Sequence, residues 1–160
     1  MSDEDPIHLA TIDWRRGKWA GFTGKYSREH TWHLSGGAKL KASDSPFMLP
    51  EVYRDNAKLD AEKLFVASVA SSHMLTWLHI AFGMEIDVMG YVDEAHGNLT
   101  EIGDGIYWVS EIILHPKIKY GAKRTATPVA EARLHELAHE QCFIANSIKT
   151  KVTVRRAEAT

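Results

Sequence analysis

Short apolar stretches separated by turn residues fill the first 45 residues of the chain. They run from Ile7 to Trp14, from Lys18 to Phe22 and from His30 to Leu34, and the turn Ser35-Gly36-Gly37 follows the last of them. Apolar runs bounded by glycine clusters are typical of strands, so we expect three short strands. From Ser43 to Asn56, proline and charged residues occur without periodicity, which predicts a long loop.

A long uncharged stretch follows, from Leu64 to Met84, without any Asp, Glu, Lys or Arg. Asp60 is placed to cap a helix, and Glu62 lies in the first turn, where a carboxylate complements the helix dipole. We therefore expect one long helix that continues to Gly83.

This stretch of 21 residues is close to the roughly 20 that cross a bilayer. Polar side chains, which are costly in hydrocarbon, interrupt it at Ser68, Ser71, Ser72, His73, Thr76 and His79. A buried central helix outside the membrane is therefore the favoured interpretation. Because a helix that is apolar on nearly all sides must be covered on nearly all sides, we expect a second subunit to supply part of the cover.

Two further strands are expected in the second half of the chain. They cover Glu85 to Val92 and Ile106 to Tyr120, with turns between them at Ala95 to Asn98 and at Gly103 to Gly105.

A second helix and a last strand complete the predicted elements. Thr127-Pro128 is a strong helix start, because the hydroxyl caps free N–H groups and proline suits the first helical position. That helix should run to about Phe143 or Ala145, and the alternation from Lys151 to Arg155 predicts an amphipathic strand. The order of elements predicts a single α+β domain over residues 1–160.

Composition agrees with one soluble domain. The 160 residues are 44% hydrophobic and 25% charged, and the net charge of -2 argues against a nucleic-acid partner. The acidic start, Met1 to Pro6, lacks the features of a secretory signal, and a single cysteine excludes an internal disulfide. Both observations favour a cytoplasmic protein.

The segment from His135 to His139 matches the zinc-protease pattern H-E-x-x-H on a predicted helix. Two histidines four residues apart can share a metal, with the glutamate as general base. A third ligand is needed, yet no histidine follows His139, and Glu158 is the one carboxylate after Glu140. A solvated helix face is the favoured interpretation, and we expect no metal.

Cys142, the only cysteine, follows in the same predicted helix. At about 100° per residue, Glu131, His135 and Cys142 share the shoulder of the apolar face, so we expect Cys142 at the rim of the core. A lone cysteine is most often a small buried hydrophobe. The structural alternatives for the other polar residues are close helix packing for the serines, dipole compensation for Glu62 and a surface charge for Arg28.

Several segments of the chain together resemble the family of osmotically induced protein C and organic hydroperoxide resistance proteins (OsmC/Ohr). The similarity is specific in two helical motifs and weaker elsewhere, and it is carried by Tyr26 to His30, Ser45-Pro46, Asp60 to Phe65, Ala70 to Leu75, Gly105 with the strand after it, and Ala138 to Asn146. It implies an intertwined homodimer with central helices packed between two curved sheets. It also implies a cofactor-free thiol peroxidase that reduces organic hydroperoxides with an external dithiol.

The resemblance assigns roles to individual residues. Ser72 occupies the position of the attacking cysteine and Cys142 that of the resolving cysteine. Arg28 is the best candidate for the arginine that keeps the thiolate ionised, with Arg54 as a weaker substitute, and Glu62 would orient that arginine. A serine hydroxyl has no sulfenic state, so the two-cysteine cycle cannot run in this chain.

Two hypotheses follow from the sequence. In the first, the chain is a peroxidase of this family in which the serine is either compensated by Cys142 or an engineered trap for an inactive state. In the second, it is a non-catalytic dimer that binds an apolar small molecule in the former substrate pocket.

Overall fold

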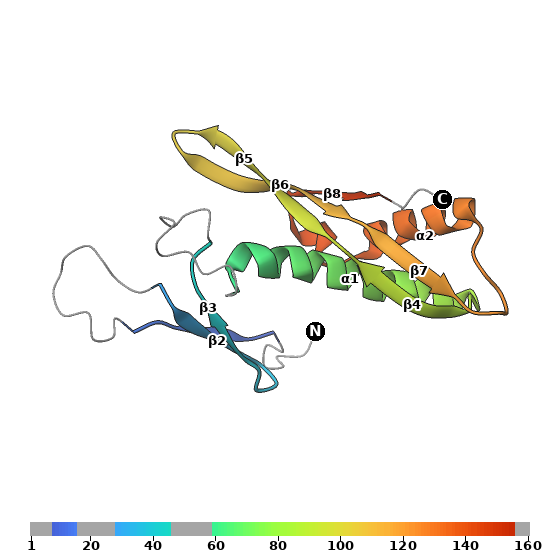
Figure 1. The fold of residues 1–160 in the computed structure, drawn as a ribbon, viewed down its shortest axis with the longest axis horizontal. Helices are drawn as coiled ribbons and strands as arrows, with labels where there is room; N and C mark the ends of the chain where they lie inside the picture. Colours follow the sequence, from blue (N-terminus) through green and yellow to red (C-terminus); the bar gives the residue numbers. More distant parts are fainter. Residues whose placement is uncertain (1–7, 16–27, 46–58, 156–160) are drawn as a thin grey trace, which may run out of the picture. The chain divides into compact units, whose positions relative to one another are not determined.

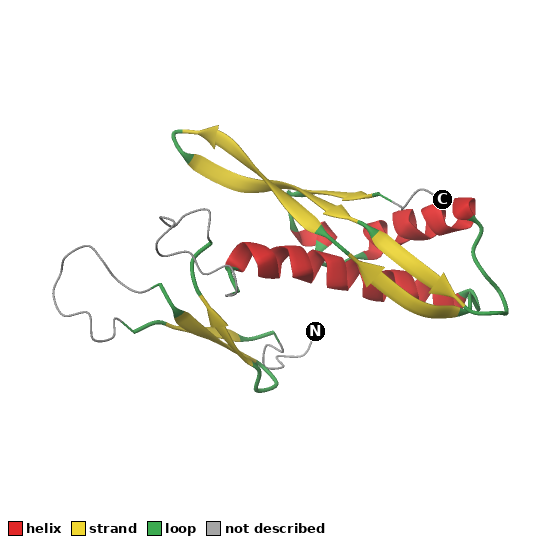
Figure 2. Cartoon of the chain, viewed as in Figure 1, coloured by secondary structure: helices red, strands yellow, loops and turns green. Residues whose placement is uncertain are grey.

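The computed structural model describes residues 8–15, 28–45 and 59–155. The chain divides into two compact units, residues 1–64 and 65–160, and each is described by itself. Helices and sheets follow one another along the chain (Figure 2), which confirms the predicted α+β class.

The first unit holds a three-stranded antiparallel sheet in the order β1-β2-β3 (Figure 1). Its strands are β1 (Ala10–Asp13), β2 (His30–Leu34) and β3 (Lys39–Ala42). Gly36 and Gly37 make the β2–β3 turn with φ values of 86° and 89°, a conformation that favours glycine. The predictions for β1 and β2 are confirmed, β3 was not predicted, and the strand expected at 18–22 lies outside the described residues.

Helix α1 (Ala61–Gly83) begins where the sequence predicts. The Asp60 carboxylate accepts a hydrogen bond from the backbone N–H of Lys63 at 2.7 Å, which caps the first turn. The fully buried positions recur every four residues, at Val69, His73, Trp77 and Ala81. One face of α1 therefore lies in the core. By length and composition alone, α1 could cross a membrane. The core helix of a soluble protein meets the same two criteria.

The second unit contains two sheets. Strands β4 (Val88–Asp93) and β7 (Pro116–Tyr120) form an antiparallel ribbon. The other sheet has the order β5-β6-β8, with β5 (His96–Gly103) antiparallel and β8 (Lys151–Val154) parallel to β6 (Ile106–Leu114). Strand β8 confirms the predicted final strand.

Two of the predicted boundaries in this unit are wrong. The stretch from Ile106 to Tyr120 is two strands in different sheets, because the chain leaves β6 at His115, whose N–H donates to the Asp93 carboxylate at 2.7 Å. The turn expected at Ala95 to Asn98 belongs largely to β5. Every residue of β5 is exposed, so the strand carries no alternation of buried and exposed positions that the sequence would reveal. The turn at Gly103 to Gly105 is confirmed.

Helix α2 (Pro128–Gln141) starts as predicted, with the Thr127 hydroxyl accepting from the N–H of Ala130 at 3.2 Å. It ends at Gln141, earlier than the expected Phe143 or Ala145. The Asn146 side-chain amide donates to the carbonyls of Glu140 and Cys142 at 2.9 and 3.0 Å, so these carbonyls are satisfied without further helical turns.

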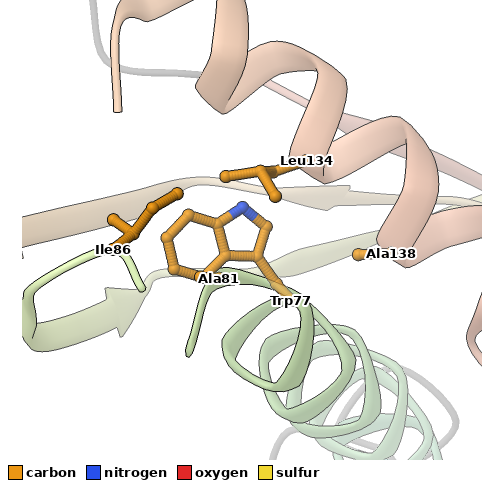
Figure 3. Packing of buried hydrophobic residues seen from close by; sticks show 5 residues of the cluster. All are labelled: Trp77, Ala81, Ile86, Leu134 and Ala138. Atoms are coloured by element: carbon orange, nitrogen blue, oxygen red, sulfur yellow. The ribbon is translucent and has the colours of Figure 1, made fainter. Parts of the chain in front are cut away.

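Helix α1 contributes to two apolar clusters. Trp77 and Ala81 pack with Ile86 and with Leu134 and Ala138 of α2 (Figure 3). Nearer the start of α1, Val69 packs with residues of the β5-β6-β8 sheet, chiefly Ile112, Leu114, Val152 and Val154. The middle of α1 between these clusters carries Ser72 and His73.

Candidate functional site

Ser72 and Cys142 meet across the contact between the two helices. The Cys142 thiol lies 3.1 Å from the Ser72 hydroxyl oxygen and donates to it. Ser72 is half-buried in the middle of α1, whereas Cys142 is the residue that follows α2 and has no exposed surface. The predicted convergence of these two positions is therefore present, although Cys142 is fully buried and not at the rim of the core.

The backbone around Cys142 is held by several hydrogen bonds. Its φ and ψ of -72° and 116° end the helix, and the N–H of Ala145 donates to its sulfur at 3.5 Å. The Cys142 carbonyl accepts from both the backbone and the side chain of Asn146, each at 3.0 Å. The sulfur thus has one hydroxyl and one backbone amide as polar neighbours among the described residues.

A buried histidine pair lies beside this contact. His73 follows Ser72 on α1, and its Nε2 lies 3.0 Å from Nδ1 of His135 on α2. The two rings are nearly coplanar, with an interplanar angle of 6°. They are 1% and 4% exposed, and the Trp77 ring stacks on His135 at a centroid distance of 5.6 Å. The pair is an inter-helix hydrogen bond inside an apolar core.

Burial changes the protonation of His73. Desolvation, with a smaller contribution from the positive charge that His139 can carry, lowers the pKa of His73 from 6.5 to about 4. His73 is therefore neutral at physiological pH. Its Nδ1 is buried and has no hydrogen-bond partner in the described part of the chain.

The H-E-x-x-H motif is divided between the interior and the surface. His135 is buried and hydrogen-bonded to His73, so the predicted solvated face is wrong for this residue, whereas His139 is exposed. Within residues 8–15, 28–45 and 59–155, no three His, Cys, Asp or Glu side chains are placed to hold one metal ion. The first histidine of the motif therefore contributes a hydrogen bond between α2 and α1.

Arg28 and Glu62, the other two predicted site residues, line one open cavity in the first unit. The cavity has a volume of about 620 Å³, and Ile12 and Trp14 supply apolar walls. Arg28 Nε lies 2.9 Å from the Asp44 carboxylate, and both side chains are about one-third exposed. Asp44 also accepts from the N–H of Ser45, so this carboxylate is fixed beside the guanidinium.

Sequence reasoning missed two of these features. Asp44 directly precedes the Ser45-Pro46 segment that carries part of the family resemblance, so its position next to a conspicuous motif was the available signal. The His73–His135 pair gave no signal, because the residues are 62 positions apart. Arg54, the weaker arginine candidate, lies outside the described residues. Whether Arg28 and Glu62 join Ser72 and Cys142 in one site stays a prediction, because these residues belong to different units.

Comparisons with known proteins identify the family of this chain. The family model for OsmC-like proteins matches residues 54–156. An OsmC-like protein of unknown function from Vibrio cholerae is 37% identical, covers 96% of this chain and 100% of its own, and superposes with a TM-score of 0.88. No curated protein matches the chain.

Two more distant structures share the fold. The organic hydroperoxide resistance protein OsmC from Legionella pneumophila is 19% identical, with 93% of each chain covered and a TM-score of 0.64. The organic hydroperoxide resistance protein OhrB of Bacillus subtilis is 15% identical, with 94% of this chain and 97% of its own covered and a TM-score of 0.65. Since the family model matches more than half of the chain and the Vibrio protein is similar over nearly all of it, this chain belongs to the OsmC-like protein family.

Proposed function

We propose that this chain reduces organic hydroperoxides through a single reacting thiol, that of Cys142. The observation that carries the proposal is the 3.1 Å contact between the Cys142 sulfur and the Ser72 hydroxyl, which occupies the position assigned to the attacking cysteine. The names of the Legionella and Bacillus relatives support organic hydroperoxides as the substrate class.

The first step of the proposed cycle oxidises Cys142. The thiolate attacks the terminal oxygen of the hydroperoxide, the O–O bond breaks, and the departing alkoxide takes a proton to leave as an alcohol. Cys142 is then a sulfenic acid. Ser72 Oγ accepts from the neutral thiol, and after ionisation the hydroxyl can rotate and donate to the thiolate, which favours the reactive form.

An external dithiol completes the cycle, because the chain has one cysteine and cannot form an internal disulfide. One thiol of the reductant attacks the sulfenic sulfur and releases water, giving a mixed disulfide. The second thiol attacks the reductant sulfur in that bond, closes the reductant's own disulfide and frees Cys142. The net reaction converts hydroperoxide and dithiol into alcohol, water and disulfide.

Arg28 and Glu62 are proposed to act from the first unit. An arginine near a thiol lowers the thiol pKa, and a carboxylate beside the arginine fixes its direction. Asp44, which already pairs with Arg28, joins Glu62 in this proposed role.

We also propose a homodimer, because α1 leaves large apolar side chains uncovered, with Leu75 60% and Phe82 59% exposed.

Hydroperoxide turnover with a dithiol, measured for the wild type and three variants, tests the proposal. We expect slow turnover by the wild type, none by Cys142→Ser, and turnover raised at least about tenfold by Ser72→Cys, because a thiol at the half-buried position 72 is more accessible than Cys142, which then resolves it. Ser71→Cys is the matched control, since it adds a thiol on an exposed neighbouring position. Equal turnover by wild type and Cys142→Ser would contradict the single-thiol proposal.

The Ser72→Cys variant also tests the geometry without turnover. A sulfur in place of the Ser72 oxygen, 3.1 Å from Cys142 Sγ, needs to move about 1 Å to reach the roughly 2.05 Å of a disulfide. We expect oxidised Ser72→Cys to form this bond within one chain and oxidised Ser71→Cys not to form it, as measured by intact mass after alkylation. A folded Ser72→Cys variant that forms no such bond would show that the site is wrongly assigned.

The cavity of the first unit favours a second candidate function, binding of an apolar small molecule without catalysis. Its volume of about 620 Å³ lies within the roughly 300–1,000 Å³ of small-molecule sites, and Ile12 and Trp14 offer apolar surface. Native mass spectrometry separates the candidates. A co-purified apolar ligand, lost in Trp14→Ala but kept in Cys142→Ser, would support binding, whereas an empty protein would count against it.

A further inference from the structure

The His73–His135 and Ser72–Cys142 contacts join the same two segments. Ser72 and His73 are adjacent on α1, while His135 and Cys142 are seven residues apart and lie within about 20° on one side of α2. A movement of α1 away from α2 that separates the two imidazole rings therefore also disturbs the surroundings of the Cys142 sulfur.

We propose that the His73–His135 pair is an acid-sensitive interlock, which holds α1 against α2 while both rings are neutral and opens access to Cys142 when the rings take up protons. This inference goes beyond the proposed function. It concerns access to a fully buried thiol and holds whether or not that thiol reduces hydroperoxides.

The hydrogen bond between the rings requires neutral imidazole. A neutral ring has one N–H donor and one bare nitrogen, so His73 Nε2 and His135 Nδ1, 3.0 Å apart, share one proton. When both rings are protonated, two N–H groups point at each other and the bond is lost. The two positive charges then repel inside the core, where burial makes charge costly.

A first proton is already unfavourable at His73. Its free ring nitrogen, Nδ1, is buried and no acceptor among the described residues reaches it, so a proton there creates an unpaired buried charge. The neighbouring Trp77 ring packs on His135 and, from β4, the ring of Tyr91 packs on Trp77. Tyr91 is the titratable group on this side, and desolvation by burial raises its pKa, so it stays neutral.

The described charged groups of α2 beside His135 are one further histidine and one carboxylate that is already paired with an arginine. On α2, His139 adds positive charge, and the Glu136 carboxylate is 2.7 Å from the guanidinium of Arg133. Strand β8 contributes two apolar side chains near His135, those of Val152 and Val154. These two valines, His135, Glu136 and His139 line a cavity of about 310 Å³, which gives protons and water a route to the His135 side of the pair.

The test is the reactivity of Cys142 toward 4,4′-dithiodipyridine from about pH 7 to about pH 4.5, divided at each pH by that of glutathione. In the wild type we expect the ratio to rise at least about tenfold toward acid. A tenfold change is what a pKa difference of one unit between the closed and the open state produces. His73→Gln keeps a polar atom near the Nε2 position but cannot take up the proton, so its ratio should stay flat. The matched control is His79→Gln, an exposed histidine on the same helix, which should behave like the wild type.

A flat ratio in the wild type, or an equal rise in a folded His73→Gln variant, would overturn the interlock. Histidine and backbone NMR of the wild type gives an answer that needs no variant. We expect the imidazole signals of His73 and His135 to titrate with the same midpoint as the amide signals of Ser72 and Cys142. Amide signals that stay unchanged while the rings titrate would equally overturn it. Turnover is not part of either measurement, so failure of the hydroperoxide proposal leaves this test intact.

Discussion

Replacing His73 with glutamine should remove part of the acid sensitivity of folding. The folded protein holds His73 neutral down to a pKa of about 4, whereas a histidine in the unfolded chain takes up its proton at 6.5. Between these values the unfolded state binds more protons, so the free energy of unfolding falls as the pH is lowered. The contribution is fully present above about pH 6.5 and is lost as the pH falls toward 4.

The size of this effect follows from the difference between the two pKa values. A separation of about 2.5 units corresponds to about 3 kcal/mol at 1.36 kcal/mol per unit, of which about 2 kcal/mol is lost by pH 5. Domains of this size have unfolding free energies of roughly 5–15 kcal/mol, so the loss is a substantial fraction of the total.

Urea unfolding at pH 7, 6 and 5, at one protein concentration, measures the effect. Other ionisable groups also titrate in this range, and the comparison between variants removes their contribution. We expect the wild type and His79→Gln to lose about 2 kcal/mol more than His73→Gln between pH 7 and pH 5. His73→Gln itself should be less stable than the wild type at pH 7, because the amide replaces an aromatic ring in a packed core.

Parallel pH dependences in the wild type and in His73→Gln would refute this reasoning. They would mean that the folded protein pays no cost for protonating His73, and hence that the buried site either admits water or supplies an acceptor for Nδ1.

Two further changes test the packing that positions the helices. Gly97→Ala should lower the free energy of unfolding by roughly 1–3 kcal/mol, because the added methyl would lie 2.8 Å from Val66 Cγ2, whereas Gly90→Ala meets only an ordinary 3.6 Å contact with Lys119 Cβ. Equal urea midpoints for the two variants would contradict the close approach of β5 to α1. Thr127→Ala should cost about 1 kcal/mol by removing the cap of α2, and Thr127→Ser should restore it. A Thr127→Ala variant as stable as the wild type would show that the cap is dispensable.

The elements with strong local signals were predictable from the sequence. Asp60 and Thr127 cap the two helices as expected, because the capping hydrogen bond depends on residues three positions away. Strand β5 was missed because its side chains are all exposed and its pairing with β6 determines its conformation. Continuity of apolar residues across His115 likewise concealed the change from one sheet to another.

The candidate site likewise has one part that was predictable from the sequence and one part that was not. The convergence of Ser72 with Cys142 was predicted through the family resemblance, and the structure brings the two atoms together. The burial of His135 was not predictable, because a histidine on the shoulder of a helix is equally compatible with solvent and with a distant partner. His73 provides that partner, and only the folded chain shows it.

The parallel pairing of β8 with β6 has a consequence for the order of assembly. Glu111 and Lys151 are register partners separated by forty positions. The edge of β6 that pairs with β8 therefore stays unpaired until the later part of the chain has been synthesised. During that interval the apolar side chains of Ile112 and Leu114 and an unpaired row of backbone groups are available to neighbouring chains. Late arrival of β8 thus leaves nascent chains of this protein with an open sheet edge that favours aggregation until the strand is added.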